Sequence, residues 1–177
     1  MLIDSHTVSV DFNGIVLFSY PELSELFPAG IQEGQDILSS FTQTNVGDQV
    51  VDLGLTIPII NIDDGDYLVR IFLDHGPADS TARKVAFSDD GYVLAVGKKA
   101  YLADAAVFWE WHEYLGWVEL SIPPGIYQAR VEGVMHIDHE GDESDIGYDI
   151  ILTRTTQLPT RTATIREDSR VIFKNSN

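Results

Sequence analysis

The sequence predicts an all-β protein, a single-domain antiparallel β-sandwich with one or two short helices. Three observations favour this fold class. Apolar and polar residues alternate over several short stretches, as in half-buried strands. The pattern Gly-x-Tyr-x-aliphatic-Arg-aliphatic occurs twice, at Gly65–Ile71 and Gly125–Val131. Seven Tyr, eight Phe and three Trp residues also suit β-structure, because aromatic rings pack well on a pleated surface.

The repeated pattern predicts two equivalent hairpin-like units. In the second unit, Trp117–Ile122 and Tyr127–Val131 alternate on either side of the turn Pro123-Pro124-Gly125. In the first unit, Ile60–Ile62 precedes the turn Asp63-Asp64-Gly65, and a similar alternating strand follows it. We expect the two units to be structural counterparts within one domain.

The other elements follow in chain order. We expect a strand over Thr7–Ser19 that bends or breaks at Gly14, and a short helix that starts near Pro21 and ends at Pro28. Further strands are predicted over Gln49–Gly54, Leu55–Ile62, Tyr67–Asp74, Val131–Ile137 and Tyr148–Thr153. A hairpin is predicted for Lys84–Ser88 and Tyr92–Val96 around Asp89-Asp90-Gly91, because Asp-Gly favours tight turns. Between Lys98 and Gly116 we expect a short helix or turn followed by extended chain.

Length and composition are those of one domain with a substantial core. The chain has 177 residues, and 44% of them are apolar, which excludes a disordered chain. No stretch approaches the roughly 20 apolar residues of a membrane helix. The absence of cysteine excludes disulfides and thiolate zinc sites. The first residues show no basic region and no apolar signal core, so a cytoplasmic protein is expected.

The net charge of −17 is unevenly distributed. We divide the chain into an acidic β-sandwich body, residues 1–153, and a Thr/Arg-rich C-terminal strand or arm of the same domain, residues 154–177. The arm carries Arg154, Arg161, Arg166, Arg170 and Lys174 but only two acidic residues. Its segments Thr162–Ile165 and Arg170–Phe173 are candidates for a last strand or two.

The acidic body limits the classes of partner. It repels nucleic acid, whose binding depends on Lys and Arg neutralising phosphates, and anionic membranes for the same reason. Electrostatic attraction would instead steer it onto a basic protein surface. The alternative is that the acidic residues only confer solubility.

Two stretches hold candidate binding residues. Met135–Asp145 contains two His and five carboxylates, which could hold calcium or, through His136, Asp138 and His139, a transition metal. The stretch matches neither a calcium-loop nor a zinc pattern, which favours a solvated hairpin loop. Phe108–Trp117 places rings among carboxylates; exposed rings would form a binding face for a protein or a sugar, and buried ones would fill the core.

The sequence gives little support to catalysis. Nothing places Glu110 and Glu113 across a cleft as a general acid/base pair. The chain has no Gly-x-Ser-x-Gly nucleophile elbow and no glycine-rich phosphate loop before a helix. We therefore predict no enzyme activity, no catalytic or metal-binding residues and no cofactor.

The order of these features resembles the competence protein J-like family, inhibitors of a DNA-entry nuclease. The similar parts are the early strand Val8–Phe18, the segment Arg83–Phe87 and, most closely, Val118–Tyr127 with its Pro-x-Gly-x-Tyr sequence. The resemblance covers about two thirds of the chain but neither the segment beyond Thr153 nor Phe108–Trp117. It implies a small β-sandwich that binds and blocks a nuclease, and the acidic charge is compatible with imitation of DNA at a basic active site.

The leading functional prediction is an acidic, non-catalytic inhibitor or immunity-type protein for a basic partner such as a nuclease. The predicted partner-binding residues are Trp109, Trp111, Asp138, Glu140, Asp142, Glu143 and Asp145. The alternative is a sugar- or calcium-binding β-sandwich module. A third hypothesis is an assembly protein whose Arg-rich arm docks on the acidic body of a neighbour.

Overall fold

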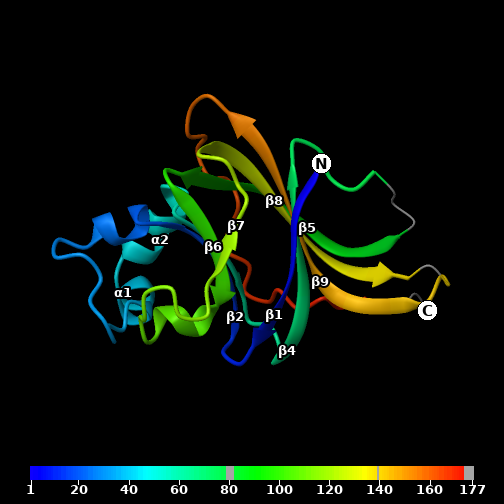
Figure 1. Ribbon diagram of the computed structural model, residues 1–177, viewed down its shortest axis with the longest axis horizontal. Coiled ribbons are helices and arrows are strands. Elements are labelled where there is room, and N and C mark those ends of the chain that lie inside the picture. Colours follow the sequence, from blue (N-terminus) through cyan, green and yellow to red (C-terminus); the bar gives the residue numbers. More distant parts are fainter. Residues whose placement is uncertain (79–81, 139, 174–177) are drawn as a thin grey trace.

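The chain folds into two β-sheets with a few short helices, as its computed structural model shows (Figure 1). The structure describes residues 1–78, 82–138 and 140–173. A five-stranded sheet has the order β1 (Leu2–Val10), β4 (Gly65–Leu73), β9 (Glu143–Thr155), β8 (Gly125–Ile137) and β5 (Arg83–Val96). A four-stranded sheet has the order β3 (Thr56–Ile60), β2 (Gly14–Tyr20), β6 (Lys99–Asp104) and β7 (Val118–Leu120). The helices are η1 (Glu22–Leu26), α1 (Leu38–Gln43), α2 (Val46–Asp52) and η2 (Ala105–Phe108). The all-β prediction is confirmed.

The strands are not all antiparallel, which corrects one part of the prediction. β4 and β9 run parallel, with Leu68–Leu73 beside Gly147–Leu152. The other neighbouring pairs in the described residues are antiparallel. Alternation within one strand reports which face is buried but not the direction of the neighbouring strand, so the sequence could not reveal the parallel pair.

The two Gly-x-Tyr units are equivalent, but they are corners between sheets rather than hairpins. The chain leaves the four-stranded sheet after β3 and enters the five-stranded sheet as β4, and it repeats this step from β7 to β8. In both copies the Tyr hydroxyl donates to a carbonyl four residues earlier, Tyr67 to Asp63 at 2.8 Å and Tyr127 to Pro123 at 2.6 Å. The preceding glycine has a positive φ in both cases, 151° and 159°. This hydrogen bond resembles the tyrosine corner of other sandwiches.

Two predicted elements are wrong. Lys84–Ser88 and Tyr92–Val96 belong to one continuous strand, β5, because the Asp-Gly pair forms a bulge: Gly91 has φ 93° and the register shifts between Asp89 and Tyr92. Gln49–Gly54 is no strand, since α2 runs to Asp52 and buries Val50 and Val51. The ambiguous Lys98–Gly116 region contains β6, then η2, then a loop.

The core lies in two layers around β2. Every residue of β2 from Gly14 to Ser19 is buried, which explains its continuous apolar run. Ile15 and Leu17 point to one face, and Val16 and Phe18 to the other. On the latter face the α-helices and η2 cover the four-stranded sheet, at the left of Figure 1. None of the helices in the described residues is long and apolar enough for a bilayer crossing.

Charged side chains are buried on the outer face of the five-stranded sheet. Asp149 is fully buried and accepts two hydrogen bonds from Arg70, at 2.7 and 2.8 Å, and one from Arg83 at 2.7 Å. Glu132 is also buried; it pairs with Arg83 and lies 3.0 Å from Nε of Arg130. Because each buried carboxylate has cationic partners, the desolvation of these charges is offset.

The connection from β4 to β5 begins on the outer face of the five-stranded sheet, against β9. β9 and β8 lie between β4 and β5 in the sheet. The N–H of Asp74 donates to the carbonyl of Leu152 at 2.7 Å. A Cβ placed on Gly76 would lie 3.5 Å from the side chain of Ile151. The start of the connection therefore lies against the outer face of the five-stranded sheet.

After Thr155 the chain closes one open side of the sandwich. The strands expected at Thr162–Ile165 and Arg170–Phe173 are absent, because the segment 156–173, here called the closing segment, has no strand in its described residues. Its backbone bonds instead to single positions on both sheets. The N–H groups of residues 162 and 163 donate to Gly91 on β5, and that of Ser169 donates to Ile60 on β3.

Two arginines of the closing segment pair with the acidic body. Arg161 donates to Asp52 at 2.6 Å, and Arg166 donates to Asp89 at 3.3 Å while lying 4.0 Å from the centre of the Phe87 ring. These pairs lie within one chain. Arg161 and Arg166 are therefore already paired and do not fit the hypothesis that the Arg-rich arm docks on a neighbouring molecule. The division of the chain at residue 153 stays a prediction; strand β9 itself continues to Thr155.

Candidate partner-binding face

A short capped turn positions the aromatic loop that follows β6. Asp104 caps η2 by accepting a hydrogen bond from the N–H of Ala106 at 2.8 Å. The same carboxylate accepts from the N–H groups of Asp11 and Phe12, at 2.6 and 3.2 Å. One side chain thereby ties the end of β6 to the corner between β1 and β2, so the loop from Trp109 to Trp117 starts from a fixed point.

The loop buries one of its predicted binding rings and exposes the other. Trp111 is only 2% exposed, and its ring packs against Trp117 at 4.8 Å and Phe18 at 6.1 Å. It cannot be the exposed contact that the sequence suggested, so the prediction for Trp111 is corrected: its ring belongs to the core. Trp109 is 56% exposed and lies against Phe12 at 4.9 Å.

Two further apolar side chains of this loop are exposed. Tyr114 is 57% exposed and Leu115 is 66% exposed. The Tyr114 ring rests on Trp117 and Tyr20, at 5.1 and 5.8 Å between ring centres. We call Trp109, Tyr114 and Leu115, with their neighbouring carboxylates, the 109–115 face. The rings of Trp109 and Tyr114 rest on the partly buried rings of Phe12, Tyr20 and Trp117, so they need less ordering before contact than free side chains would.

Carboxylates and one histidine surround these rings. His112 lies between Glu33, 2.5 Å from Nδ1, and Glu110, 3.2 Å from Nε2. These hydrogen bonds, that to Glu33 first, raise the pKa of His112. Glu113 accepts a hydrogen bond from the Tyr20 hydroxyl at 2.6 Å, and burial together with this carboxylate raises the pKa of Tyr20. Glu110 and Glu113 thus have partners within the chain, which disfavours their prediction as free sugar acceptors.

The predicted acidic loop is the exposed tip of the β8–β9 hairpin. Asp138, Glu140, Asp142, Glu143 and Asp145 are all exposed there. Asp138 accepts the backbone N–H groups of Glu140 and Asp142, at 2.9 Å each, which holds the turn. The carboxylate oxygens of these three residues lie within 4.8 Å of one another. Exposed acidic groups commonly come this close without a metal, so calcium binding stays a prediction. His139 lies outside the described residues.

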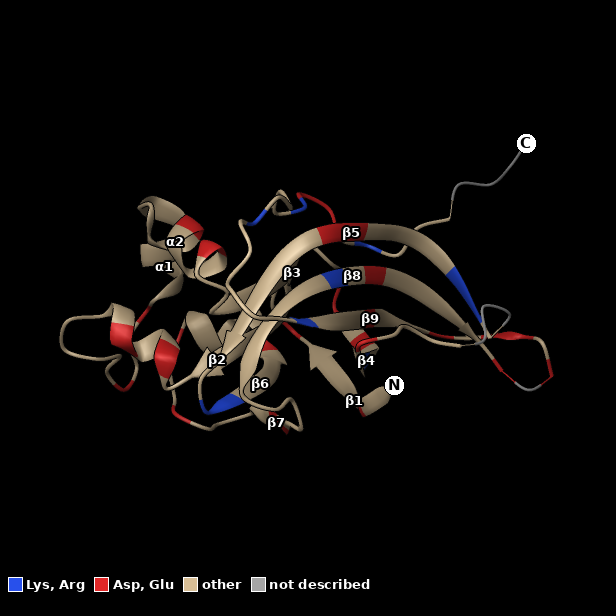
Figure 2. Cartoon of the chain, turned by 90° about the horizontal axis from the view of Figure 1, so that it is seen from above, with Lys and Arg blue, Asp and Glu red and all other residues tan. Residues whose placement is uncertain are grey.

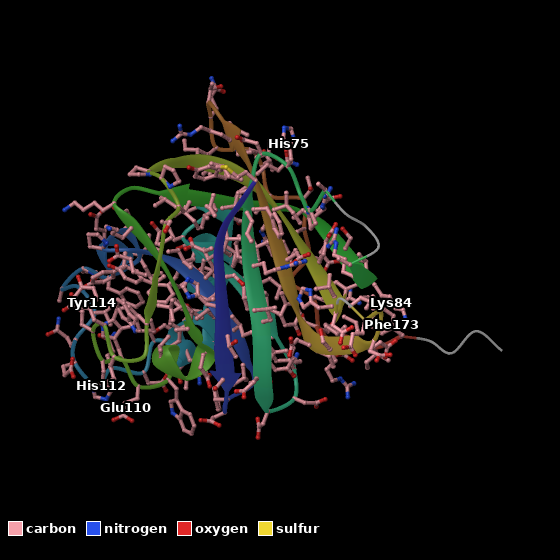
Figure 3. All side chains as sticks on the ribbon, turned by 45° about the vertical axis from the view of Figure 1, so that its right-hand side comes forward. His75, Lys84, Glu110, His112, Tyr114 and Phe173 are labelled. Carbon is pink, nitrogen blue, oxygen red and sulfur yellow. The ribbon has the colours of Figure 1, made fainter. Side chains whose placement is uncertain are left out.

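The structure does not bring the two predicted groups together. Figure 3 labels Glu110, His112 and Tyr114 on one side of the molecule and Lys84 on the other, and Lys84 pairs with Glu143 of the hairpin tip at 2.6 Å. Figure 2 likewise places the acidic hairpin tip at one end of the long axis, with further acidic residues near the helices at the other end. The ring cluster and the acidic tip are therefore separate surfaces.

Tyr114 and Leu115 were missed as individual binding candidates. Leu115 precedes Gly116, and both Tyr114 and Gly116 have positive φ, 64° and 72°. A tight loop with such residues turns side chains outward irrespective of an alternating pattern. The glycine next to an apolar residue was the available signal for an exposed tip.

Fold and surface together define a small acidic β-sandwich protein with an exposed aromatic loop. No family model and no curated protein matches the sequence. Among solved structures, one described as crocagin biosynthetic gene J aligns with a TM-score of 0.50 and 15% identity, over 87% of this chain and 97% of that one. ComJ from Bacillus subtilis, described as an inhibitor of the DNA degrading activity of NucA, aligns with a TM-score of 0.49 and 9% identity, over 88% and 98%.

These likenesses concern the fold. The alignment with the crocagin protein shows that the two chains share the sandwich architecture. The resemblance to the competence protein J-like family, which the sequence suggested, is also found between the structures, at low identity.

Proposed function

We propose that this protein is a non-catalytic binding protein that inhibits a basic partner, such as a nuclease, by covering its active site. The observation that carries this proposal is the 109–115 face. Trp109, Tyr114 and Leu115 are exposed in one loop, and the rings of Trp109 and Tyr114 lie against partly buried rings. Large rings on a firm base are the residues that dominate protein–protein binding energies.

The charge of the molecule supports a basic partner. Glu33, Glu110 and Glu113 lie around the exposed rings, and the whole chain carries a net charge of −17. A surface of this sign attracts Lys and Arg side chains and accelerates encounter with a basic protein. The sequence resemblance to nuclease inhibitors points to the same class of partner.

The test is a DNA-cleavage assay with a panel of purified basic nucleases. We expect the protein to slow cleavage by at least one of them in a stoichiometric manner. Trp109→Ala should weaken that inhibition about 30-fold, since truncation of a hot-spot ring costs about 2 kcal/mol. Leu53→Ala is the matched control, because Leu53 is also an exposed apolar residue but lies outside the face. Equal inhibition by Trp109→Ala and wild type would exclude the 109–115 face.

The acidic tip has a separate expected role in the rate of association. We expect neutralisation of Asp142, Glu143 and Asp145 to lower the association rate constant and to weaken its salt dependence. The dissociation rate constant should stay close to that of the wild type, because the tip lies away from the ring contact. Stopped-flow measurements at low and high salt separate these effects. An unchanged association rate would remove the tip from the proposal.

A further inference from the structure

A cavity of about 370 Å³ lies between the two α-helices and the four-stranded sheet. Its volume falls in the lower part of the range of small-molecule sites, roughly 300–1,000 Å³. Its walls come from parts of the chain that are distant in sequence: the corner before β2, both α-helices, strand β3 and the helix η2. Phe12 contributes to the wall and also contacts Trp109. The cavity therefore borders the 109–115 face, but different side chains line it.

The wall is mainly apolar, and its polar lining residues are three threonines, the exposed Asn13 and Asp48. Its fully buried part includes Val16, Val50 and Phe108. Three threonines also line it, and each hydroxyl already donates to a backbone carbonyl: Thr42 to Leu38 at 3.0 Å, Thr44 to Ser40 at 2.6 Å, and Thr56 to Leu17 at 3.1 Å. A ligand therefore meets methyl groups and rings rather than free hydroxyl donors.

The charge at the mouth disfavours an anionic ligand. Asp48 is the charged residue among the described lining residues, and its side chain is 73% exposed and lies 3.6 Å from Arg161. Asp52 shares this single arginine, so the group of three side chains keeps one net negative charge, which disfavours a ligand anion. A neutral molecule enters at no such cost.

The helices that cover the cavity are short. α1 has six residues and α2 has seven, and neither has a side-chain hydrogen bond at its N-cap. Helices of this length are held by packing rather than by their own stability. The packing of buried side chains such as Val50 and Val51 therefore holds α2 over the cavity.

We propose that this cavity binds a small, uncharged, apolar molecule with the size of a fused aromatic ring system or a branched alkyl group. Three observations support this assignment: the mainly apolar wall, the threonine hydroxyls that already donate to backbone carbonyls, and the carboxylate of Asp48. It is independent of the proposed inhibition of a nuclease, because the ligand contacts the wall beneath α1 and α2 rather than the exposed rings.

The experiment uses N-phenyl-1-naphthylamine, a neutral dye whose emission rises in apolar surroundings. We expect the fluorescence of the dye, excited at its own absorption band, to rise and saturate at one dye molecule per chain. The melting temperature of the protein should rise with dye concentration. The anionic dye 1-anilinonaphthalene-8-sulfonate should bind more weakly, and Asp48→Asn should narrow the difference between the two dyes. Equal binding of both dyes to the wild type would contradict the role given to Asp48.

Matched variants locate the site. Thr42→Trp places a ring over the mouth and should weaken binding of the neutral dye at least about tenfold; the control is Gln43→Trp, on the next, exposed residue of α1 that does not line the cavity. Ile60→Trp fills the cavity from the sheet and should weaken binding equally, so the test does not depend on one variant folding. Trp109→Ala should leave dye binding unchanged. Wild-type affinity in both filled variants, or loss of binding in Trp109→Ala alone, would overturn the proposal.

Discussion

At the scale of single residues, two histidines have opposite electrostatic surroundings. His112 is flanked by Glu33 and Glu110, whose hydrogen bonds raise its pKa. His136 is buried beside the outer-face ion cluster. Burial first, and then the nearby Arg70 and Arg83, lower its pKa, against the opposing effect of Asp149 and Asp145. The fold thus separates two groups that would titrate alike in an unfolded chain.

We expect NMR titration to place the midpoint of His112 above, and that of His136 below, the ordinary value of 6.5. Because the folded chain resists protonation of His136, the contribution of this residue to stability is fully present above pH 6.5 and is lost as the pH falls through its lowered pKa. The contribution of His112 has the opposite sign: it is present below pH 6.5 and is lost as the pH rises through its raised pKa. Replacement of one histidine by Gln should remove only the pH dependence of the unfolding free energy that this histidine contributes. Coincident midpoints would refute the two assignments.

At the scale of elements, the two sheets are joined by repeated corners. Each corner combines a glycine of positive φ, which only glycine tolerates easily, with a Tyr hydroxyl that fixes the turn. The corner places β4 and β8 on either side of β9. The two strands that flank β9 at the centre of the five-stranded sheet therefore both begin at a corner of the same type.

We expect Tyr67→Phe and Tyr127→Phe each to lower the free energy of unfolding by about 0.5–1.5 kcal/mol, because each loses one hydrogen bond to a backbone carbonyl. Urea denaturation measures the change. Tyr114→Phe is the control, since that side chain is exposed, and it should change stability by less than either corner variant. A loss no larger than that of the control would show that the hydroxyls do not hold the corners.

The sequence was informative where structure is local and uninformative where it depends on distant partners. The Gly-x-Tyr units and the alternation of β4 and β8 were predictable, because both are periodic within a few residues. Whether the strand before each unit lies in the same sheet is decided by packing far along the chain. Trp109 and Trp111 illustrate the same limit at the site: alternation would place both rings on one face, but η2 and the turn at Trp109 interrupt the period, so one ring is buried and the other is exposed.

At the scale of the whole molecule, the sandwich has two open sides, and they are closed differently. On one side β1 lies near β7, where Asp4 accepts hydrogen bonds from Ser121. On the other side the closing segment lies between β5 and β3 and buries Ala163 and Ser169. The hydroxyl of Tyr148, in the middle of the five-stranded sheet, donates to the carbonyl of Ser169 at 2.8 Å. The segment is thereby tied to the core as well as to the two edges.

We expect a chain that ends at Thr155 to lose amide hydrogen-exchange protection in β3 and β5 while β1 and β4 keep theirs. The reason is that the removed contacts to strand edges all lie on one side of the sandwich. A chain that ends at Ser169 is the control, because it retains the bonds to Gly91, Ile60 and Tyr148, and its protection should resemble that of the full chain. Uniform loss of protection in the shorter chain, on both sides of the sandwich, would contradict a local closing role.

The closing segment also sets an order of events on the ribosome. All strands of the described residues have been synthesised by Thr155, but the residues that join β5 to β3 follow them. A nascent chain can therefore assemble both sheets while the side of the sandwich between β5 and β3 is still open. Uncovered strand edges can pair with other chains, and partly open chains are substrates for proteolysis. A stop codon placed shortly after Thr155 would thus yield a product that cellular quality control can distinguish from the full chain, although it contains every strand of the described residues.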